Sequence, residues 1–427
     1  MQKLALDGGP RAVPQGMIKD WPPIDDIDRK MVLASLEQPH HAFGPNCTEL
    51  EKEYAAWNGN KYCISTNSGT AALHMAVAAC GVGAGDHVLV SAYSWSSSAT
   101  CIIHHNAIPV FVDIDFDTIN LDVNKIEKAI TPRTKAIIVV HLHGLAVNMD
   151  KVMAVSRKHK LKVIEDACQA HGAMFKGRKV GTMGDCAAFS LNQNKCLCSG
   201  EGGLFVTNNA EINNAARQVW NFGESSTPMQ KRDFHAYALG WMYRNNDLTA
   251  AFGRAQLRKL DKYLAMGKRN GDLLLTSIKG LPCLIPPTEP RGHWHNWYNF
   301  TSRIDFDKMG YTGNRARFRD AVMKALNIEG VPVGVWQSYI LPAMTVFQAK
   351  NAYGKGCPWT CRHGAASKVD YSPSKFPVAL KHCDAHFGMT VPLRAPNGPN
   401  VARAVAKGFE KIFTNLENLD VEKILAS

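Results

Sequence analysis

A lysine in a glycine-rich segment and a carboxylate that ends an apolar run upstream are the residues with the clearest chemical potential. Lys195 lies within residues 190–203, and Asp166 ends the run that begins at Leu161. A lysine amine forms a Schiff base with a carbonyl group, and an aspartate can keep a pyridine nitrogen protonated. Pyridoxal phosphate (PLP) chemistry requires both protein groups, so the pair predicts a PLP enzyme.

Each of these two residues has an ordinary interpretation by itself. Most lysines are solvated surface charges, and a strand that ends in Glu-Asp often begins a turn. The neighbouring residues favour the chemical interpretation, because Gly200, Gly202 and Gly203 permit a backbone that passes close to a ligand before the strand 204–207. Ser190, which ends a short apolar segment, can offer its hydroxyl group to a phosphate.

A third segment could bind the phosphate group of such a cofactor. Small hydroxyl residues and Gly69 open an apolar helix that we expect to run to Ala79. Helix N-termini expose unpaired N–H groups that bind phosphate well. The ordinary alternative is a helix cap formed by Ser68 or Thr70.

A fourth segment places an aromatic side chain near the end of a predicted strand. Trp95 follows the apolar strand 88–90. Open α/β sheets bind ligands at the carboxyl ends of their strands, where this indole could stack on a pyridine ring. A tryptophan in the hydrophobic core is the alternative.

The elements that must position these residues indicate an α/β fold. Apolar strands at 136–140 and 163–164 alternate with helical stretches, so we expect a mainly parallel sheet covered by helices. The chain of 427 residues is long enough for two domains. We expect a large PLP-binding domain over 1–260, ending after the helical run 247–257, and a smaller α/β domain over 261–427.

Several motifs in order along the chain resemble the DegT/StrS family of sugar and cyclitol aminotransferases, which belongs to the aspartate-aminotransferase-like superfamily. The resemblance covers nearly the whole chain, and it implies a PLP-dependent transferase of fold type I. The motifs are residues 67–73, 110–115, 131–136, 165–169, 181–185 and 200–203.

The resemblance also implies a role for each candidate residue. Lys195 would form the internal aldimine, Asp166 would pair with the pyridinium nitrogen, and Trp95 would occupy the stacking position. Gln169 falls where family members carry a His or Gln beneath the ring or near its phenolic oxygen. The residues that match the family's phosphate contacts are Gly69, Thr70 and Ser190.

One position departs from the family pattern. Family members commonly carry an Asn that reaches the cofactor phosphate across a dimer interface, and Met242 stands at that position here. Tyr243, Arg244, Asn245 or Asn246 could replace the missing amide, or the contact is absent and the cofactor is held more loosely. The sequence leaves these alternatives open.

The expected activity is ping-pong transamination through Lys195, from glutamine or glutamate to a keto-cyclitol or keto-sugar. Residues 4–14 and 330–337 look most like the cyclitol and antibiotic-sugar aminotransferases. An aminoshikimate-type dehydrating and aromatising enzyme stays open, because residues 20–29 are similar to that branch. Lys195 argues against the sugar 3-dehydratase branch, whose members resemble this family but carry a histidine at the Schiff-base position.

The formal net charge of +12 raises a different class of function, a non-enzymatic regulator that binds nucleic acid. Lysine and arginine are dispersed, and no polybasic block or complete zinc-finger spacing supports that class. We expect small-molecule amino donor and keto acceptor partners instead of nucleic acid. The resemblance further implies a homodimer whose active sites are shared between subunits.

The remaining motifs have simpler interpretations. Cys357, Cys361 and His363 lack a clear fourth ligand, so we predict no metal site and interpret 341–377 as an excursion that shapes the acceptor side of the pocket. We expect residues 293–297 to serve packing, before a small-domain strand at 298–304. No apolar window is long enough for a membrane span, and no signal segment is evident, which predicts a cytoplasmic protein with reduced cysteines.

Overall fold

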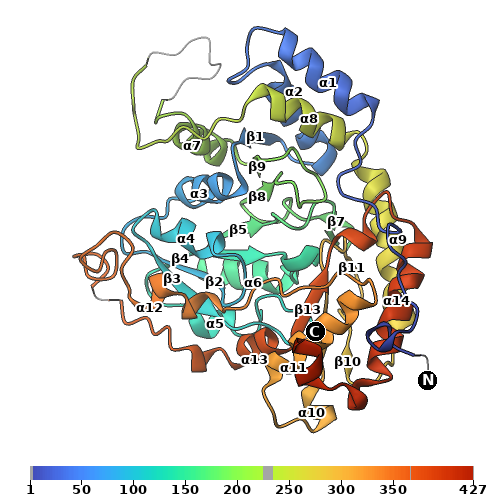
Figure 1. The fold of residues 1–427 in the computed structure, drawn as a ribbon. Coiled ribbons are helices and arrows are strands. Elements are labelled where there is room, and N and C mark those ends of the chain that lie inside the picture. The colour runs from blue at the N-terminus through green and yellow to red at the C-terminus, as the bar shows by residue number, and fades with distance from the viewer. Residues whose placement is uncertain (1–2, 225–233, 366, 427) are drawn as a thin grey trace.

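The structure is a computed structural model that describes residues 3–224, 234–365 and 367–426. A seven-stranded sheet forms its centre, with the spatial order β1-β9-β8-β5-β4-β2-β3 (Figure 1). The strands are β1 (Tyr62–Thr66), β2 (His87–Ser91), β3 (Ile108–Val112), β4 (Thr134–Val140), β5 (Lys162–Asp166), β8 (Cys186–Ser190) and β9 (Gly203–Thr207).

The sheet is mainly parallel, as the sequence predicts. Strands β3, β2, β4, β5 and β8 pair in parallel, and only the two pairings made by β9 are antiparallel. Because Asp166 pairs in register with Ala188, the end of β5 lies beside β8 two residues before Ser190. The carboxyl ends of β5 and β8 therefore deliver the predicted carboxylate and the lysine loop to the same edge of the sheet.

Helices cover both faces of this sheet, because alternate strand residues enter two separate cores. Val88 and Val90 pack on one face with α3, α4 and α7, and Leu89 packs on the other with α2, α6 and α8. The helices in the first 260 residues are α1 (Asp26–Glu37), α2 (Pro45–Asn58), α3 (Gly69–Ala79), α4 (Ser97–Ile103), α5 (Ile126–Ala129), α6 (Met149–His159), α7 (Ala210–Trp220) and α8 (Asp247–Leu257).

A second, antiparallel sheet lies in the C-terminal part of the chain. Its strands are β10 (Leu284–Ile285), β12 (Phe300–Ile304) and β13 (His386–Met389), with β12 in the middle. The long helices α9 (Leu260–Ile278) and α14 (Pro399–Phe413) pack side by side next to it (Figure 1). The other helices of this part are α10 (Phe306–Met309), α11 (Arg315–Ile328), α12 (Thr345–Gln348), α13 (Pro377–Ala385) and α15 (Val421–Ala426).

Two segments pack on the other half of the chain, so the unit built on the large sheet and the C-terminal unit are joined by more than the chain connection. Leu4 and Val13, near the N-terminus, are buried in the C-terminal core, whereas Phe347, within the 341–377 excursion, packs on Phe111 of β3. The excursion thus covers the outer strand of the large sheet. The division at residue 260 stays a prediction.

A small three-stranded sheet joins the two halves of the chain. Strand β11 (His293–Trp294) pairs with β6 (Met174–Phe175), which pairs with β7 (Arg178–Lys179). The expected strand 298–304 begins two residues later, at Phe300, because the N–H group of Tyr298 donates to the Asn296 side chain and not to a neighbouring strand. Within the described ranges, no helix has the length and apolar composition needed to cross a bilayer.

Candidate active site

The loop that carries Lys195 is held from both ends of the chain. It leaves β8 after Ser190, and the Nε1 of Trp21 donates to the carbonyl oxygens of Gln193 and Lys195, each at 3.1 Å. The Nη1 of Arg394 donates to the carbonyl oxygen of Asn194 at 2.7 Å. These bonds satisfy loop carbonyl groups that no strand partner serves, and they position the lysine.

The Lys195 amine contacts a tyrosine from the C-terminal half of the chain. Its Nζ donates to the phenolic oxygen of Tyr298 at 3.2 Å and lies 4.8 Å from the centre of that ring. Tyr298 is buried, and its carbonyl oxygen accepts a hydrogen bond from Arg394. Sequence reasoning placed Tyr298 in a strand and missed this contact. A tyrosine among buried aromatic residues, whose hydroxyl group needs a partner, was the available signal.

Asp166 ends β5 with both carboxylate oxygens engaged. Oδ2 accepts from the hydroxyl group of Ser98 at 2.7 Å, and Oδ1 accepts from the N–H group of Cys168 at 3.2 Å. Ser98 lies in the first turn of α4 and also hydrogen-bonds Ser94 at 2.8 Å. Sequence reasoning assigned no role to Ser98, which the fold brings onto the candidate carboxylate.

The thiol of Cys168 senses the charges of both principal residues. Burial raises the pKa of its thiol, the negative charge of Asp166 raises it further, and the positive charge of Lys195 opposes the change. Both charges therefore act on one side chain, as expected if Asp166 and Lys195 border the same site.

The first turn of α3 packs against the end of β8 and the start of β9. A Cβ on Gly69 would lie 2.9 Å from the Cβ of Ser190, and a Cβ on Gly203 would lie 2.4 Å from the carbonyl carbon of Ser68. Ser68 caps α3 by accepting from the N–H group of Ala71 at 3.1 Å. The cap uses that N–H group, and phosphate binding by the other N–H groups at the start of α3 stays a prediction.

The other candidate residues surround this centre. Thr70 is exposed in the first turn of α3. Trp95 is 54% exposed, so it is not a core residue, and its ring lies 6.3 Å from that of Trp336. The side-chain oxygen of Gln169 accepts from the N–H group of His143 at 2.8 Å.

The segment around Met242 runs beside the candidate phosphate loop of its own chain. The carbonyl oxygen of Met242 accepts from Asn67 at 3.4 Å, and Arg244 forms a backbone bridge with Thr66. Other residues proposed to replace the missing amide also make hydrogen bonds within their own chain: Tyr243 with His74, Asn245 with Thr249, and Asn246 as the cap of α8.

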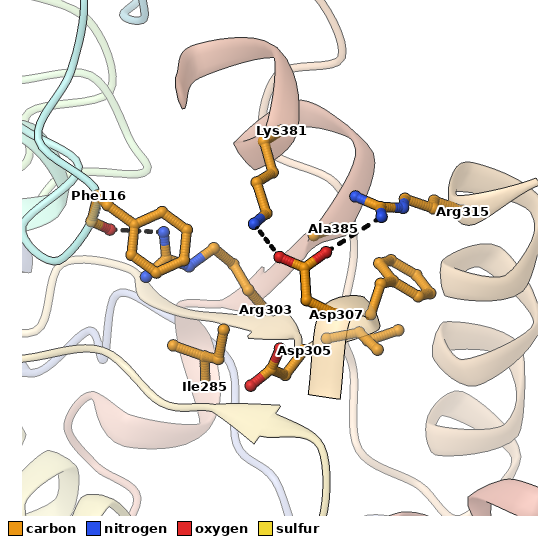
Figure 2. A pocket seen from close by; sticks show the side chains of 10 residues that line it. Phe116, Ile285, Arg303, Asp305, Asp307, Arg315, Lys381 and Ala385 are labelled. Atoms are coloured by element: carbon orange, nitrogen blue, oxygen red, sulfur yellow. Dashed lines mark hydrogen bonds and ion pairs between the residues drawn. The ribbon is translucent and has the colours of Figure 1, made fainter. Parts of the chain in front are cut away.

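A cavity of about 250 Å³ lies elsewhere, where the two units meet (Figure 2). Lys381 and Arg315 both pair with Asp307, while Arg303 donates to the carbonyl oxygen of Phe116 and stacks 3.9 Å from that ring. None of the candidate catalytic or cofactor-binding residues lines it. Through Arg303, this region joins the loop after β3 to strand β12.

The described side chains contain no group of three or more His, Cys, Asp or Glu residues arranged as metal ligands. The donor groups present fit PLP instead. A helix N-terminus suits its phosphate, a buried carboxylate suits its ring nitrogen, and a lysine amine suits its carbonyl carbon.

Sequence comparisons agree with this chemistry. The model of the DegT/DnrJ/EryC1/StrS aminotransferase family matches residues 22–364. The spore coat polysaccharide biosynthesis protein SpsC of Bacillus subtilis is 34% identical, over 72% of this chain and 81% of that protein. GDP-perosamine synthase of Caulobacter vibrioides is 41% identical, over 58% of this chain and 66% of that protein. L-glutamine:2-deoxy-scyllo-inosose aminotransferase of Streptoalloteichus tenebrarius is 38% identical, over 64% of this chain and 66% of that protein.

Solved structures agree with the fold. DesV of S. venezuelae, in complex with a ketimine intermediate, has a TM-score of 0.78 at 25% identity, covering 90% of this chain and 93% of that one. 3-Amino-5-hydroxybenzoic acid (AHBA) synthase has a TM-score of 0.81 at 26% identity, and the match covers 93% of this chain and 99% of that one. The chain therefore belongs to the DegT/DnrJ/EryC1/StrS aminotransferase family, as a PLP-dependent enzyme of fold type I.

Proposed function

We propose that this enzyme moves an amino group from glutamine or glutamate to a keto-cyclitol or keto-sugar. The observation that carries the proposal is the convergence of Lys195, Asp166 and the first turn of α3 around Cys168 and Ser190. This arrangement supplies the three protein contacts that PLP requires. The names of the relatives that act with L-glutamine on an inosose, or that make GDP-perosamine, support the substrate class.

Each residue has a proposed task. Bound PLP supplies a ring that accepts electron density from the α-carbon of the amino donor. Lys195 would hold the cofactor through its carbonyl carbon, and its amine, once displaced by the amine of the donor, would move the proton at the donor α-carbon. Asp166 keeps the ring nitrogen protonated, and Ser98 orients the carboxylate. Trp95 stacks on the ring.

The remaining candidates bind the phosphate and the polar edge of the ring. The N-terminus of α3 would hold the phosphate, because its N–H groups and the helix dipole favour an anion. Gln169 approaches the ring from the turn after β5. The proposed phosphate contacts are Gly69, Thr70 and Ser190.

We also propose a cytoplasmic homodimer with shared active sites. Large apolar side chains are exposed among the described residues, including Trp95, Phe222 and Met242, as expected for a face that a second copy covers. All twelve cysteines are free, which supports a reducing compartment. Sedimentation velocity combined with an activity assay tests the dimer, and a fully active monomer would contradict it.

The test of the reaction is the visible absorption spectrum of the PLP-loaded protein during titration with L-glutamine and L-glutamate. We expect a Schiff-base band that converts to the pyridoxamine form with at least one donor. Addition of 2-deoxy-scyllo-inosose should restore the band and yield an amine detectable by mass spectrometry. Lys195→Ala should show no band, whereas the exposed Lys135→Ala should behave as the wild type.

Each alternative outcome has a clear meaning. Without a Schiff-base band in the wild type, the role of Lys195 is wrong. A band that neither donor discharges would favour the second candidate, a dehydrating and aromatising enzyme, which the likeness to AHBA synthase supports. Discharge without an amine product would reject this acceptor and retain the donor half-reaction.

A further inference from the structure

An arginine in the wall of the cavity of about 250 Å³ is almost fully buried and is only partly hydrogen-bonded (Figure 2). Arg303, in β12, is 3% exposed, and its Nη1 donates to the carbonyl oxygen of Phe116 while the guanidinium group stacks on that ring. Among the described residues, its Nε and Nη2 have no hydrogen-bond partner, and no carboxylate forms an ion pair with it. Solvent reaches both nitrogens, because neither is among the closed-off polar atoms without a partner, which do include the Nε of Arg394. The free side of the guanidinium group therefore opens to the cavity that Arg303 lines.

A buried guanidinium group with one hydrogen bond is an incomplete arrangement. Buried charges in proteins are normally paired or hydrogen-bonded, because burial removes the water that solvates them. Burial lowers the pKa of Arg303 to about 10, and the charges of Asp117, Asp115 and Asp305 act in the opposite direction from beyond ion-pair distance. Of these three carboxylates, only Asp305 lines the cavity. Arg303 is still charged at pH 7, so an anion that reaches Nε and Nη2 would complete its contacts.

The other charged groups at the cavity already have partners. Lys381 and Arg315 both pair with Asp307, as Figure 2 shows, so two cations engage that carboxylate. Asp305 accepts a hydrogen bond from the N–H group of Lys308 at 3.1 Å. The lining thus holds three cations and two carboxylates, which leaves one positive charge for a ligand to balance.

The remaining walls of the cavity are apolar and indicate the body of that ligand. Ligand pockets combine such walls with a few polar groups, and 250 Å³ lies just below their usual range of about 300–1,000 Å³, so the ligand is small. The apolar lining residues are Phe116, Ile285, Ile304, Phe306 and Ala385.

The geometry of the free nitrogens indicates the polar end of the ligand. The Nε and Nη2 of an arginine donate in parallel, and a carboxylate accepts such a pair with its two oxygens. A carboxylate also carries the single negative charge that the lining calls for. A phosphate dianion fits less well, because Asp305 and Asp307 in the same lining would repel its second charge.

We propose that this cavity binds a small organic monocarboxylate, whose oxygens accept from the Nε and Nη2 of Arg303 and whose carbon body packs on the apolar walls. The site is separate from the candidate active site, because no candidate catalytic or cofactor-binding residue lines the cavity. The inference does not depend on which amino donor or acceptor the enzyme uses.

Calorimetric titration of the PLP-loaded protein with sodium benzoate, at low ionic strength, tests the site. We expect a dissociation constant of about 1 mM or below. Benzamide has nearly the same shape and no charge, so it should bind about tenfold more weakly or worse, and so should inorganic phosphate. The Schiff-base band of Lys195 should stay constant during the titration, because benzoate binds away from the cofactor.

Two variants separate the charge from the space. Arg303→Gln should weaken benzoate binding about tenfold or more, because it removes the paired charged donors. Ile285→Phe retains the arginine and fills part of the cavity, so it should weaken binding as well. The exposed Arg269→Gln is the matched control and should bind benzoate as the wild type does. If Arg303→Gln does not fold, Ile285→Phe and the crystal structure with benzoate decide.

That crystal structure should place the benzoate oxygens about 2.7–2.9 Å from the Nε and Nη2 of Arg303. Density for benzoate only beside Lys195, or a Schiff-base band that changes with the same midpoint as binding, would assign the ligand to the active site and overturn the proposal. The absence of binding, equal affinity for benzoate and benzamide, or unchanged affinity in the folded Arg303→Gln variant would also overturn it. Tighter binding of phosphate that depends on Arg303 would reject the carboxylate as the ligand class.

Discussion

The Nζ of Lys195 donates a hydrogen bond to the phenolic oxygen of Tyr298, 3.2 Å away and 103 positions later in the chain. The lysine belongs to the loop after β8, and the tyrosine comes just before β12. The amine proposed to move the proton is thus oriented by a side chain from the C-terminal half. Arg394 holds the two residues in place, because it donates to the carbonyl oxygen of Asn194, next to Lys195, and to the carbonyl oxygen of Tyr298.

Tyr298→Phe should slow transamination about 10- to 100-fold and still allow the Schiff base to form. The variant keeps the buried ring and removes only the hydroxyl group that orients Lys195, and hydrogen bonds to charged groups contribute about 1.5–3 kcal/mol. Stopped-flow measurement of glutamine discharge reports the loss. Tyr339→Phe, at a position that is 66% exposed, is the matched control. An unchanged rate would show that the contact does not serve proton transfer.

Asp166→Asn should reduce the turnover number by about 100-fold or more, because an amide cannot hold the cofactor nitrogen in its protonated form. Ser98→Ala should cost about tenfold, since it removes one hydrogen bond to Oδ2 and leaves the carboxylate in place. Steady-state kinetics of both variants should reveal this order. The exposed Ser338→Ala serves as control, and a larger loss in Ser98→Ala than in Asp166→Asn would refute the assigned roles.

Gly203→Ala should weaken PLP binding by about tenfold or more. Its methyl group would lie 2.4 Å from the carbonyl carbon and oxygen of Ser68 and would push the first turn of α3 away from Ser190. Fluorescence titration of the apo-protein with PLP measures the effect. An added Cβ on Gly83 meets nothing within 4 Å, so Gly83→Ala should bind PLP as the wild type does. Equal affinities would exclude this close approach as a requirement.

Stability should fall as the pH drops from 7 to 5. Burial lowers the pKa of His74 and His143 to about 3, and that of His171 and His386 to about 4. Unfolded histidines bind protons near pH 6.5, so the unfolded state takes up protons that the folded state excludes. Each histidine then removes up to about 1.4 kcal/mol of stability per pH unit below 6.5.

Urea unfolding midpoints at several pH values test this dependence. Burial also lowers the pKa of His382, whose ring nitrogens have no partner among the described residues, so His382→Phe should flatten the decline. The exposed His363→Gln should leave the slope unchanged. A midpoint that stays constant between pH 7 and 5 would show that these histidines do not limit stability.

The elements of the large sheet follow from local sequence patterns. Apolar runs bounded by turn residues mark β4, β5 and β9 to within two residues at each end, and the helix predicted at 247–257 has the observed bounds of α8. Buried parallel strands need near-continuous apolar runs, and an amphipathic helix needs a regular apolar spacing. Such patterns are complete within a dozen residues.

The boundaries in the C-terminal half were harder to predict. The composition of residues 298–299 predicts a strand. The side-chain oxygen of Asn296, however, accepts a hydrogen bond from the N–H group of Tyr298, which therefore does not join the sheet. The excursion 341–377 stays a predicted wall of the acceptor pocket, and two of its buried aromatic side chains, Phe347 and Tyr371, also pack on Phe111 of β3. At Tyr298, a side chain two positions earlier overrides the strand preference of the composition.

The sequence by itself determined the chemistry: a lysine after one strand and an aspartate at the end of another, in motifs short enough to recognise. Only the tertiary structure decided which side chains serve them. Ser98 lies 68 positions from Asp166, and Tyr298 lies 103 positions from Lys195. Nothing in the local pattern of one partner specifies the other, because the tertiary fold brings α4 to the end of β5 and the segment before β12 to the lysine loop.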